Sequence, residues 1–112
     1  MTTTSIYTEA CLDAFINCNN LLSGLDGKST GLPVRVKKII EESAQICLGT
    51  FHAIKNHSVN VPGLALLCVG ICEECAEVCE RVESLAFQQC AQACRICSKC
   101  ILDFAVQSEE SL

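Results

Sequence analysis

Cysteines spaced at helical intervals constrain the fold of this chain more than any other feature of its sequence. The stretch 68–100 holds eight of the eleven cysteines. Four of them follow one another at steps of four, three and four residues: Cys68, Cys72, Cys75 and Cys79. At ~100° per residue, these steps keep all four side chains on one face of a helix. The sequence therefore predicts a helix with one face of thiols.

A second row of cysteines repeats the first at an offset of 22 residues. Its first three members copy the earlier spacing, and a fourth thiol flanks them: Cys90, Cys94, Cys97 and Cys100. The position that matches Cys79 is Ile101. Two thiol-lined helices are therefore expected.

Apolar residues recur at helical spacing in four segments of the sequence. The expected helices span residues 4–22, 32–55, 64–83 and 85–107. Turn-forming residues over 23–31 and 56–63 separate the first three, and Leu32-Pro33 opens the second. We expect a tight turn near Glu83-Ser84, with Ser84 as the cap, between the last two.

The break near Ser84 depends on packing, because no glycine or proline marks it. None occurs between Ile71 and Leu112, so a single helix of ~40 residues would also satisfy the pattern. Such a helix would leave its thiol face with nothing in this chain to pack against. Two helices are therefore the better prediction.

Four helices of about 20 residues with short connections predict an all-α, antiparallel up-down-up-down four-helix bundle with a cysteine-lined core. Residues 1–112 would form this bundle as a single domain. Each helix offers inward positions at 0, +4 and +7, which the first two helices fill with Cys11-Phe15-Cys18 and Cys47-Phe51-Ile54. Phe15 and Phe51 are expected to plug the axis partly.

Composition excludes several classes of function. The net charge is −5 with lysine and arginine scattered singly, which gives no basic surface for nucleic acid. No run of about 18 or more apolar residues occurs, so we expect no membrane span. The segment Met1–Ser5 lacks the basic and apolar regions of an export signal. We therefore expect a cytoplasmic protein, and reduced cytoplasmic thiols serve metal or redox chemistry more often than disulfide frameworks.

Packing and disulfides are two alternatives to metal binding. A buried thiol behaves as a small hydrophobe, so the isolated Cys47 could serve core packing as readily as metal binding. Two C-x3-C pairs also resemble a helical hairpin stapled by two disulfides, which would be a thiol redox or interaction module: Cys75, Cys79, Cys90 and Cys94. That pairing leaves seven cysteines unexplained.

Zinc and iron–sulfur sites are a third alternative. Cys94, Cys97 and Cys100 have the spacing that opens a bacterial ferredoxin motif. A zinc-ribbon spacing joins Cys72 and Cys75 to Cys94 and Cys97. Both kinds of site normally lie in turns, whereas these cysteines are expected in helix interiors.

Cuprous ion suits the thiol rows better. Cu(I) is a soft cation that accepts a few thiolate ligands, and cysteines one helical turn apart can share an ion without any loop. Buried thiolates without metal would repel one another, whereas bound ions displace the protons and neutralise the row. We expect several Cu(I) ions per chain on all eleven cysteines: Cys11, Cys18, Cys47, Cys68, Cys72, Cys75, Cys79, Cys90, Cys94, Cys97 and Cys100.

The repeated C-x3-C and C-x2-C steps resemble the cysteine-rich four-helix bundle copper storage proteins. The specific part of the resemblance is Cys68 to Cys100, and the absent export signal is similar to the cytosolic branch. The resemblance implies a homotetramer of bundles that binds many Cu(I) ions and catalyses no reaction. Because the first two helices supply only Cys11, Cys18 and Cys47, we expect metal to favour the third and fourth helices.

The two histidines are further candidate ligands. In the antiparallel bundle His57 would lie at the end shared with Cys11, Cys68 and Cys100, where the resemblance implies a core open to solvent and a histidine that admits metal. His52 lies ~140° from Cys47 around its helix, so it is the weaker candidate. No nucleophile, base and orienting acid converge in the sequence, so we expect no enzyme.

Overall fold

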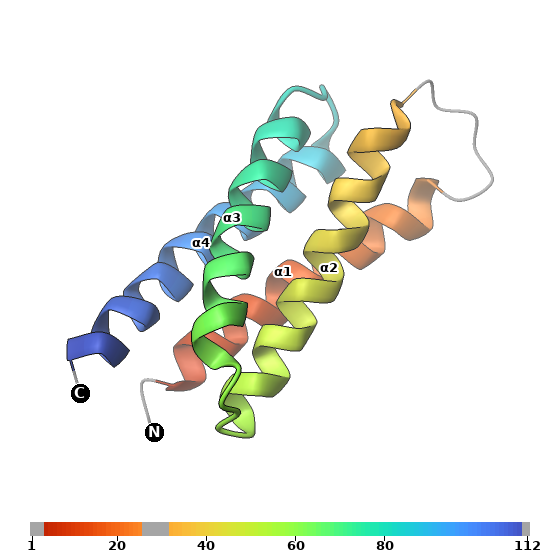
Figure 1. The fold of residues 1–112 in the computed structure, drawn as a ribbon. Helices are drawn as coiled ribbons and strands as arrows, with labels where there is room; N and C mark the ends of the chain where they lie inside the picture. The colour runs from red at the N-terminus through yellow and green to blue at the C-terminus, as the bar shows by residue number, and fades with distance from the viewer. Residues whose placement is uncertain (1–3, 26–31, 111–112) are drawn as a thin grey trace.

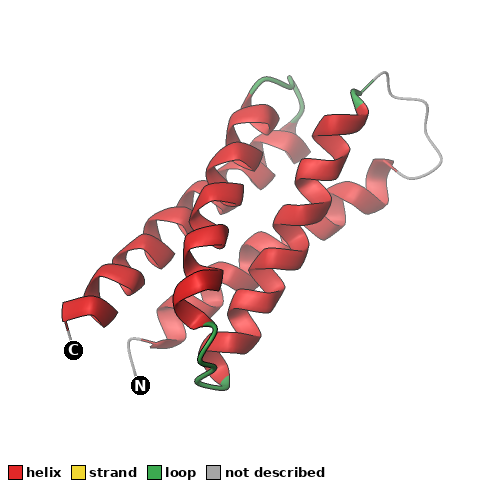
Figure 2. Ribbon diagram, in the orientation of Figure 1, coloured by secondary structure: helices red, strands yellow, loops and turns green. Residues whose placement is uncertain are grey.

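A computed structural model describes residues 4–25 and 32–110 of the chain, and the secondary structure of this part is helical (Figures 1 and 2). Its elements are α1 (Thr4–Leu25), α2 (Val34–Lys55), α3 (Val61–Glu80) and α4 (Leu85–Glu110). None of these helices combines the length and apolarity that crossing a membrane requires. The predicted all-α fold is confirmed.

The helices form a ring in which each packs against two neighbours. α1 and α3 each contact both α2 and α4. The start of α1, the end of α4 and the α2–α3 connection lie at one end of the bundle, and the α3–α4 turn lies at the other (Figure 1). The four cysteine-bearing faces therefore share one interior.

The end of α1 and the start of α3 differ from the sequence prediction. α1 continues through Ser23 and Gly24 to Leu25, because Leu25 still packs against the core; residues 26–31 of the expected loop lie outside the described residues. α3 begins at Val61 and not at residue 64, since Pro62 is tolerated in a first helical turn.

The expected break between the last two helices is confirmed. α3 ends at Glu80, three residues before the predicted end at residue 83. The backbone carbonyl of Ser84 accepts a hydrogen bond from the amide of Gln88 at 3.0 Å. The side chain of Gln88 also donates to the carbonyls of Glu80 and Val82, at 3.1 and 2.9 Å. Gln88 thus satisfies carbonyls that the end of α3 leaves open, without glycine or proline.

One arginine ties the exposed faces of α3 and α4 together. Arg95 on α4 forms ion pairs of 2.8 Å with both Glu73 and Glu80 on α3. Because these groups are partly solvated, the pairs add little stability and mainly fix how the two thiol-bearing helices face each other.

Among the described residues, the fully buried side chains other than cysteine are small or aliphatic, and none is a phenylalanine ring. Ala14 and Thr50 are fully buried, whereas Phe15 and Phe51 are only partly buried against the core. The Phe51 ring lies beside the exposed His52, with ring centroids 5.2 Å apart. The expectation that Phe15 and Phe51 plug the axis is therefore wrong: each lies one residue, ~100°, away from the axial position.

His57 ends α2 in a backbone conformation that favours glycine. Its φ is 54°, and the amides of His57 and Ser58 donate to the carbonyls of Ile54 and Ala53 at 3.3 and 2.9 Å. This is a Schellman motif with histidine at its left-handed position. A side chain at that position costs about 1 kcal/mol or more.

We predict that His57→Gly stabilises the metal-free protein, because glycine removes this backbone strain. The melting temperature should rise by roughly 4 °C, as expected for about 1 kcal/mol in a chain of this size. Thermal unfolding followed by circular dichroism measures the change. Asn56→Gly is the matched control and should lower the melting temperature, since Asn56 has φ −96°. A melting temperature of His57→Gly at or below that of the unmodified chain would contradict the assignment.

Candidate metal centre

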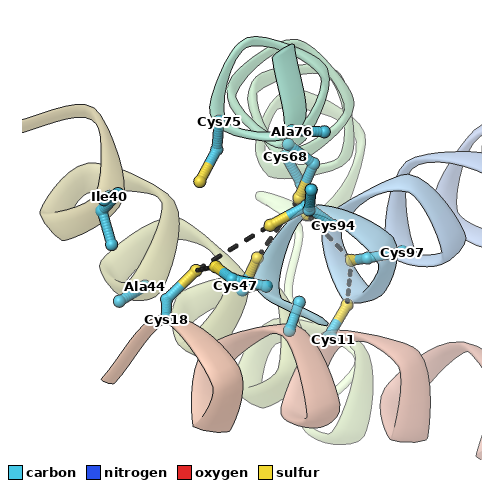
Figure 3. Packing of buried hydrophobic residues seen from close by; sticks show 14 of the residues in the cluster. Cys11, Cys18, Ile40, Ala44, Cys47, Cys68, Cys75, Ala76, Cys94 and Cys97 are labelled. Carbon is cyan, nitrogen blue, oxygen red and sulfur yellow. Dashed lines mark hydrogen bonds between the residues drawn. The ribbon is translucent and has the colours of Figure 1, made fainter. Parts of the chain in front are cut away.

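The cysteine rows of all four helices point into the bundle. Ten of the eleven cysteines are 0% exposed, and Cys100 is half-buried. Figure 3 shows sulfur atoms from different helices directed toward one another across the interior. The bundle thus gathers thiols that lie far apart in the sequence.

The first cluster of sulfurs, the Cys18 group, joins three helices. Its members come from α1, α3 and α4, and their sulfur atoms all lie within 4.8 Å of one another: Cys18, Cys75, Cys90 and Cys94. The Cys18 sulfur lies 3.6 Å from that of Cys90 and 3.8 Å from that of Cys94. A single metal ion could contact several of these sulfurs at once.

The second cluster, the Cys47 group, joins a different set of three helices. Its members come from α2, α3 and α4 and meet within the same 4.8 Å: Cys47, Cys68, Cys72 and Cys97. The Cys47 and Cys72 sulfurs are 3.4 Å apart, and those of Cys68 and Cys97 are 3.8 Å apart. Each group therefore takes one sulfur from α1 or α2 and three from α3 and α4.

The three remaining cysteines lie around the two groups. The Cys11 sulfur is 4.0 Å from that of Cys97, which connects it to the Cys47 group. Cys79 interacts with Cys75 and Cys90 of the Cys18 group. Cys100 lies on the wall of a surface hollow between α1 and α4, beside Ile6 and Ile96.

Both histidines lie outside the sulfur clusters. His52 and His57 are exposed, and the described metal-competent clusters contain cysteine alone. Their predicted role as ligands is neither confirmed nor contradicted by this placement.

Hydrogen bonds among the thiols spread their pKa values apart. Hydrogen bonds with neighbouring sulfurs hold the pKa of Cys94 and Cys68 below the ordinary value, and the largest contributions come from the contacts with Cys18 and Cys11 respectively. Hydrogen bonds to neighbouring sulfurs, and then burial, raise the pKa of other cysteines: Cys11, Cys47, Cys72, Cys75, Cys90 and Cys97. Most sulfurs of each group therefore hold their protons more firmly than a free thiol does.

The clustered thiols are close enough to bind soft metal ions together, and they form no disulfide. All described cysteines are free, and their closest sulfur separations of 3.4 to 4.0 Å far exceed the length of a disulfide bond, ~2.05 Å. Thiolate-only ligand sets select soft cations such as Cu(I). Fold and site together define a four-helix bundle with a thiol core suited to soft metal ions.

Comparison with known proteins gives the family. The sequence model of the copper storage protein family, Csp, matches residues 2–105, so the chain belongs to this family. The chain is similar to a Bacillus subtilis (strain 168) protein called uncharacterized cysteine-rich protein YhjQ, with 29% identity over 98 residues that cover 83% of this chain and 91% of that protein.

A solved structure agrees with the family assignment. The Cu(I)-bound copper storage protein BsCsp3 superposes with a TM-score of 0.86 and 26% identity, covering 93% of this chain and 99% of that one. The resemblance and the four-helix bundle predicted from sequence are thus confirmed. The family and the two buried four-cysteine groups also support the predicted function, storage of several Cu(I) ions.

We predict that the metal-free protein loses stability as pH rises from about 9 to about 10.5. An unfolded thiol releases its proton near pH 9, whereas the six thiols with raised pKa keep theirs in the folded state. Above that pH the unfolded chain binds fewer protons, so the free energy of unfolding falls, by up to about 1.4 kcal/mol per pH unit for each such thiol. Three thiols have a lowered pKa instead: Cys68, Cys79 and Cys94. They add stability as pH rises toward 9, but above that pH they are ionised in both the folded and the unfolded state and no longer oppose the loss.

Melting temperatures measured anaerobically across this pH range test the prediction. The variant Cys72→Ala/Cys97→Ala removes two of the raised thiols and should show a shallower pH dependence than the unmodified chain. Cys100→Ala serves as the control and should keep the original slope. A melting temperature that stays constant from about pH 9 to about pH 10.5 would show that the buried thiols do not keep their protons in the folded state.

Proposed function

We propose that this chain stores Cu(I) in the cytoplasm as a homotetramer of four-helix bundles and catalyses no reaction. The observation that carries the proposal is the pair of buried four-cysteine groups. We assign the ligands to all eleven cysteines, with the Cys18 and Cys47 groups as the main stores and Cys11, Cys79 and Cys100 around them.

Charge balance favours Cu(I) over a divalent ion in this core. Among the described residues, the buried polar side chains are Thr8, Ser43, Thr50 and Ser98, and none is charged. As a group fills, Cu(I) ions that share thiolates can reach one positive charge for each thiolate, whereas a single Zn²⁺ on four thiolates leaves two negative charges buried without a counter-charge. Burial of unpaired charge is costly, so the core favours the monovalent ion.

Each Cu(I) ion that enters replaces thiol protons, which leave to solvent. Without metal the sulfurs remain neutral thiols that pack as small apolar groups, so the empty bundle stays folded. Six of the eight grouped sulfurs come from α3 and α4, in line with the expectation that metal favours these helices. Cys18 and Cys47 add the contribution of α1 and α2.

Metal would enter at the end of the bundle that carries the α2–α3 connection. His57 is exposed there, and we propose it as the ligand that admits Cu(I), with His52 a weaker candidate one turn earlier. The exposed imidazole can bind and release an ion faster than a buried thiol.

Exposed aliphatic side chains on α1 and α4 support self-association. Ile6, Ile16 and Ile96 lie in or beside one surface hollow and are 44 to 57% exposed. Burial of such a face against other copies would fit the proposed tetramer.

An anaerobic Cu(I) titration against a competing chelator tests the storage proposal. We expect several ions per unmodified chain and a clear loss of capacity in Cys72→Ala/Cys94→Ala, which removes one sulfur from each group. Cys100→Ala is the matched control and should keep most of the capacity, because Cys100 belongs to neither group. Binding of no more than one ion per chain would reject storage.

A free-thiol count on freshly purified protein separates storage from the disulfide-stapled alternative. Storage requires that nearly all eleven cysteines react after unfolding. Two structural disulfides in a redox or interaction module would leave about seven, since each disulfide consumes two thiols.

A further inference from the structure

A serine occupies one position of the thiol core. Ser43 lies one helical turn before Cys47 on α2 and is 0% exposed. Its Oγ is 3.6 Å from the Cys18 sulfur, whose thiol donates to it, and 3.7 Å from the Cys94 sulfur. Because Oγ accepts from Cys18, its own hydroxyl proton can be donated to Cys94.

The hydroxyl makes the two sulfur groups different. Within the described part of the chain, Ser43 has the only hydroxyl recorded in contact with a sulfur of either group. Thr50, the other fully buried hydroxyl of α2, donates instead to the carbonyl of Ile46 at 2.7 Å. In the described part of the chain, the Cys18 group therefore has a hydroxyl beside its sulfurs, and the Cys47 group has none.

The first ion to enter a group creates an excess negative charge. Cu⁺ and two thiols give a two-coordinate bis-thiolate complex of charge −1, and two protons leave to solvent. In a core without buried charged side chains, hydrogen-bond donors must stabilise this charge. A hydroxyl that donates to a thiolate forms a stronger bond than one between neutral groups.

We propose that Ser43 directs the first Cu(I) ion to Cys18 and Cys94, so that the Cys18 group begins to fill before the Cys47 group. The sulfurs of these two cysteines are 3.8 Å apart, and both contact Ser43. On deprotonation, Cys18 stops donating to Oγ, and the Ser43 hydroxyl donates to a metal-bound thiolate. This inference rests on the proposed Cu(I) storage and adds an order of loading to it.

The test measures the affinity for the first Cu(I) ion by chelator competition in two backgrounds. Cys47→Ala/Cys97→Ala keeps the Cys18 group, and Cys18→Ala/Cys94→Ala keeps the Cys47 group. Adding Ser43→Ala should weaken first-ion binding about tenfold in the former background, as expected for loss of a hydrogen bond to a charged group. In the latter it should change the affinity by less than about twofold, because the contacts of Ser43 are already gone.

Thr50→Val is the matched control, since it removes a buried hydroxyl that contacts no sulfur. It should leave the first-ion affinity unchanged in both backgrounds, and Ser43→Thr, which keeps the hydroxyl, should restore tight binding. Melting temperatures of the metal-free variants separate a general loss of stability from an effect on metal. If one of the double-cysteine variants does not fold, the full chain is instead loaded with one equivalent of Cu(I), and its free thiols are mapped by alkylation. Cys18 and Cys94 should then be protected from alkylation in the unmodified chain but not in Ser43→Ala.

The outcomes separate this inference from the storage proposal. If neither the unmodified chain nor any variant binds Cu(I), the storage proposal is rejected. If Cu(I) binds but Ser43→Ala weakens both backgrounds equally, or neither, Ser43 does not direct loading.

Discussion

Contact between sulfur atoms of different helices is the interaction on which the rest of the structure depends. The Cys47 and Cys72 sulfurs meet at 3.4 Å across α2 and α3, and Cys18 meets Cys90 at 3.6 Å across α1 and α4. Such approach requires small residues along the axis, which Ala14 and Thr50 provide. The core is therefore apolar enough to fold empty and dense enough in sulfur to hold soft ions.

The predictable part of the site follows from helical periodicity. Three- and four-residue steps fix which cysteines share a helix face, so the rows Cys68–Cys79 and Cys90–Cys97 could be placed inside a bundle from the sequence alone. Which sulfurs from opposite helices meet depends on the rotation and axial offset of each helix. Those depend on packing, so the division into the Cys18 and Cys47 groups could not be read from spacing.

The sequence prediction chose the wrong inward-facing residue where two neighbouring residues fit the helical periodicity almost equally well. Phe15 and Ala14 both lie near the Cys11 face, and the side chain that fits the narrow axis is the smaller one. The serine of the core was missed although Ser43 and Cys47 repeat the spacing of the C-x3-C pairs. Helix ends were missed where tertiary contacts set them, as with Leu25 and Gln88.

Copper K-edge X-ray absorption on the anaerobically loaded protein tests the central claim most directly. If the two thiol groups hold the cargo, the first shell of the stored ions consists of sulfur, and neighbouring copper ions are bridged by shared thiolates. A first shell dominated by oxygen or nitrogen, or isolated copper ions without copper neighbours, would contradict storage in the sulfur core.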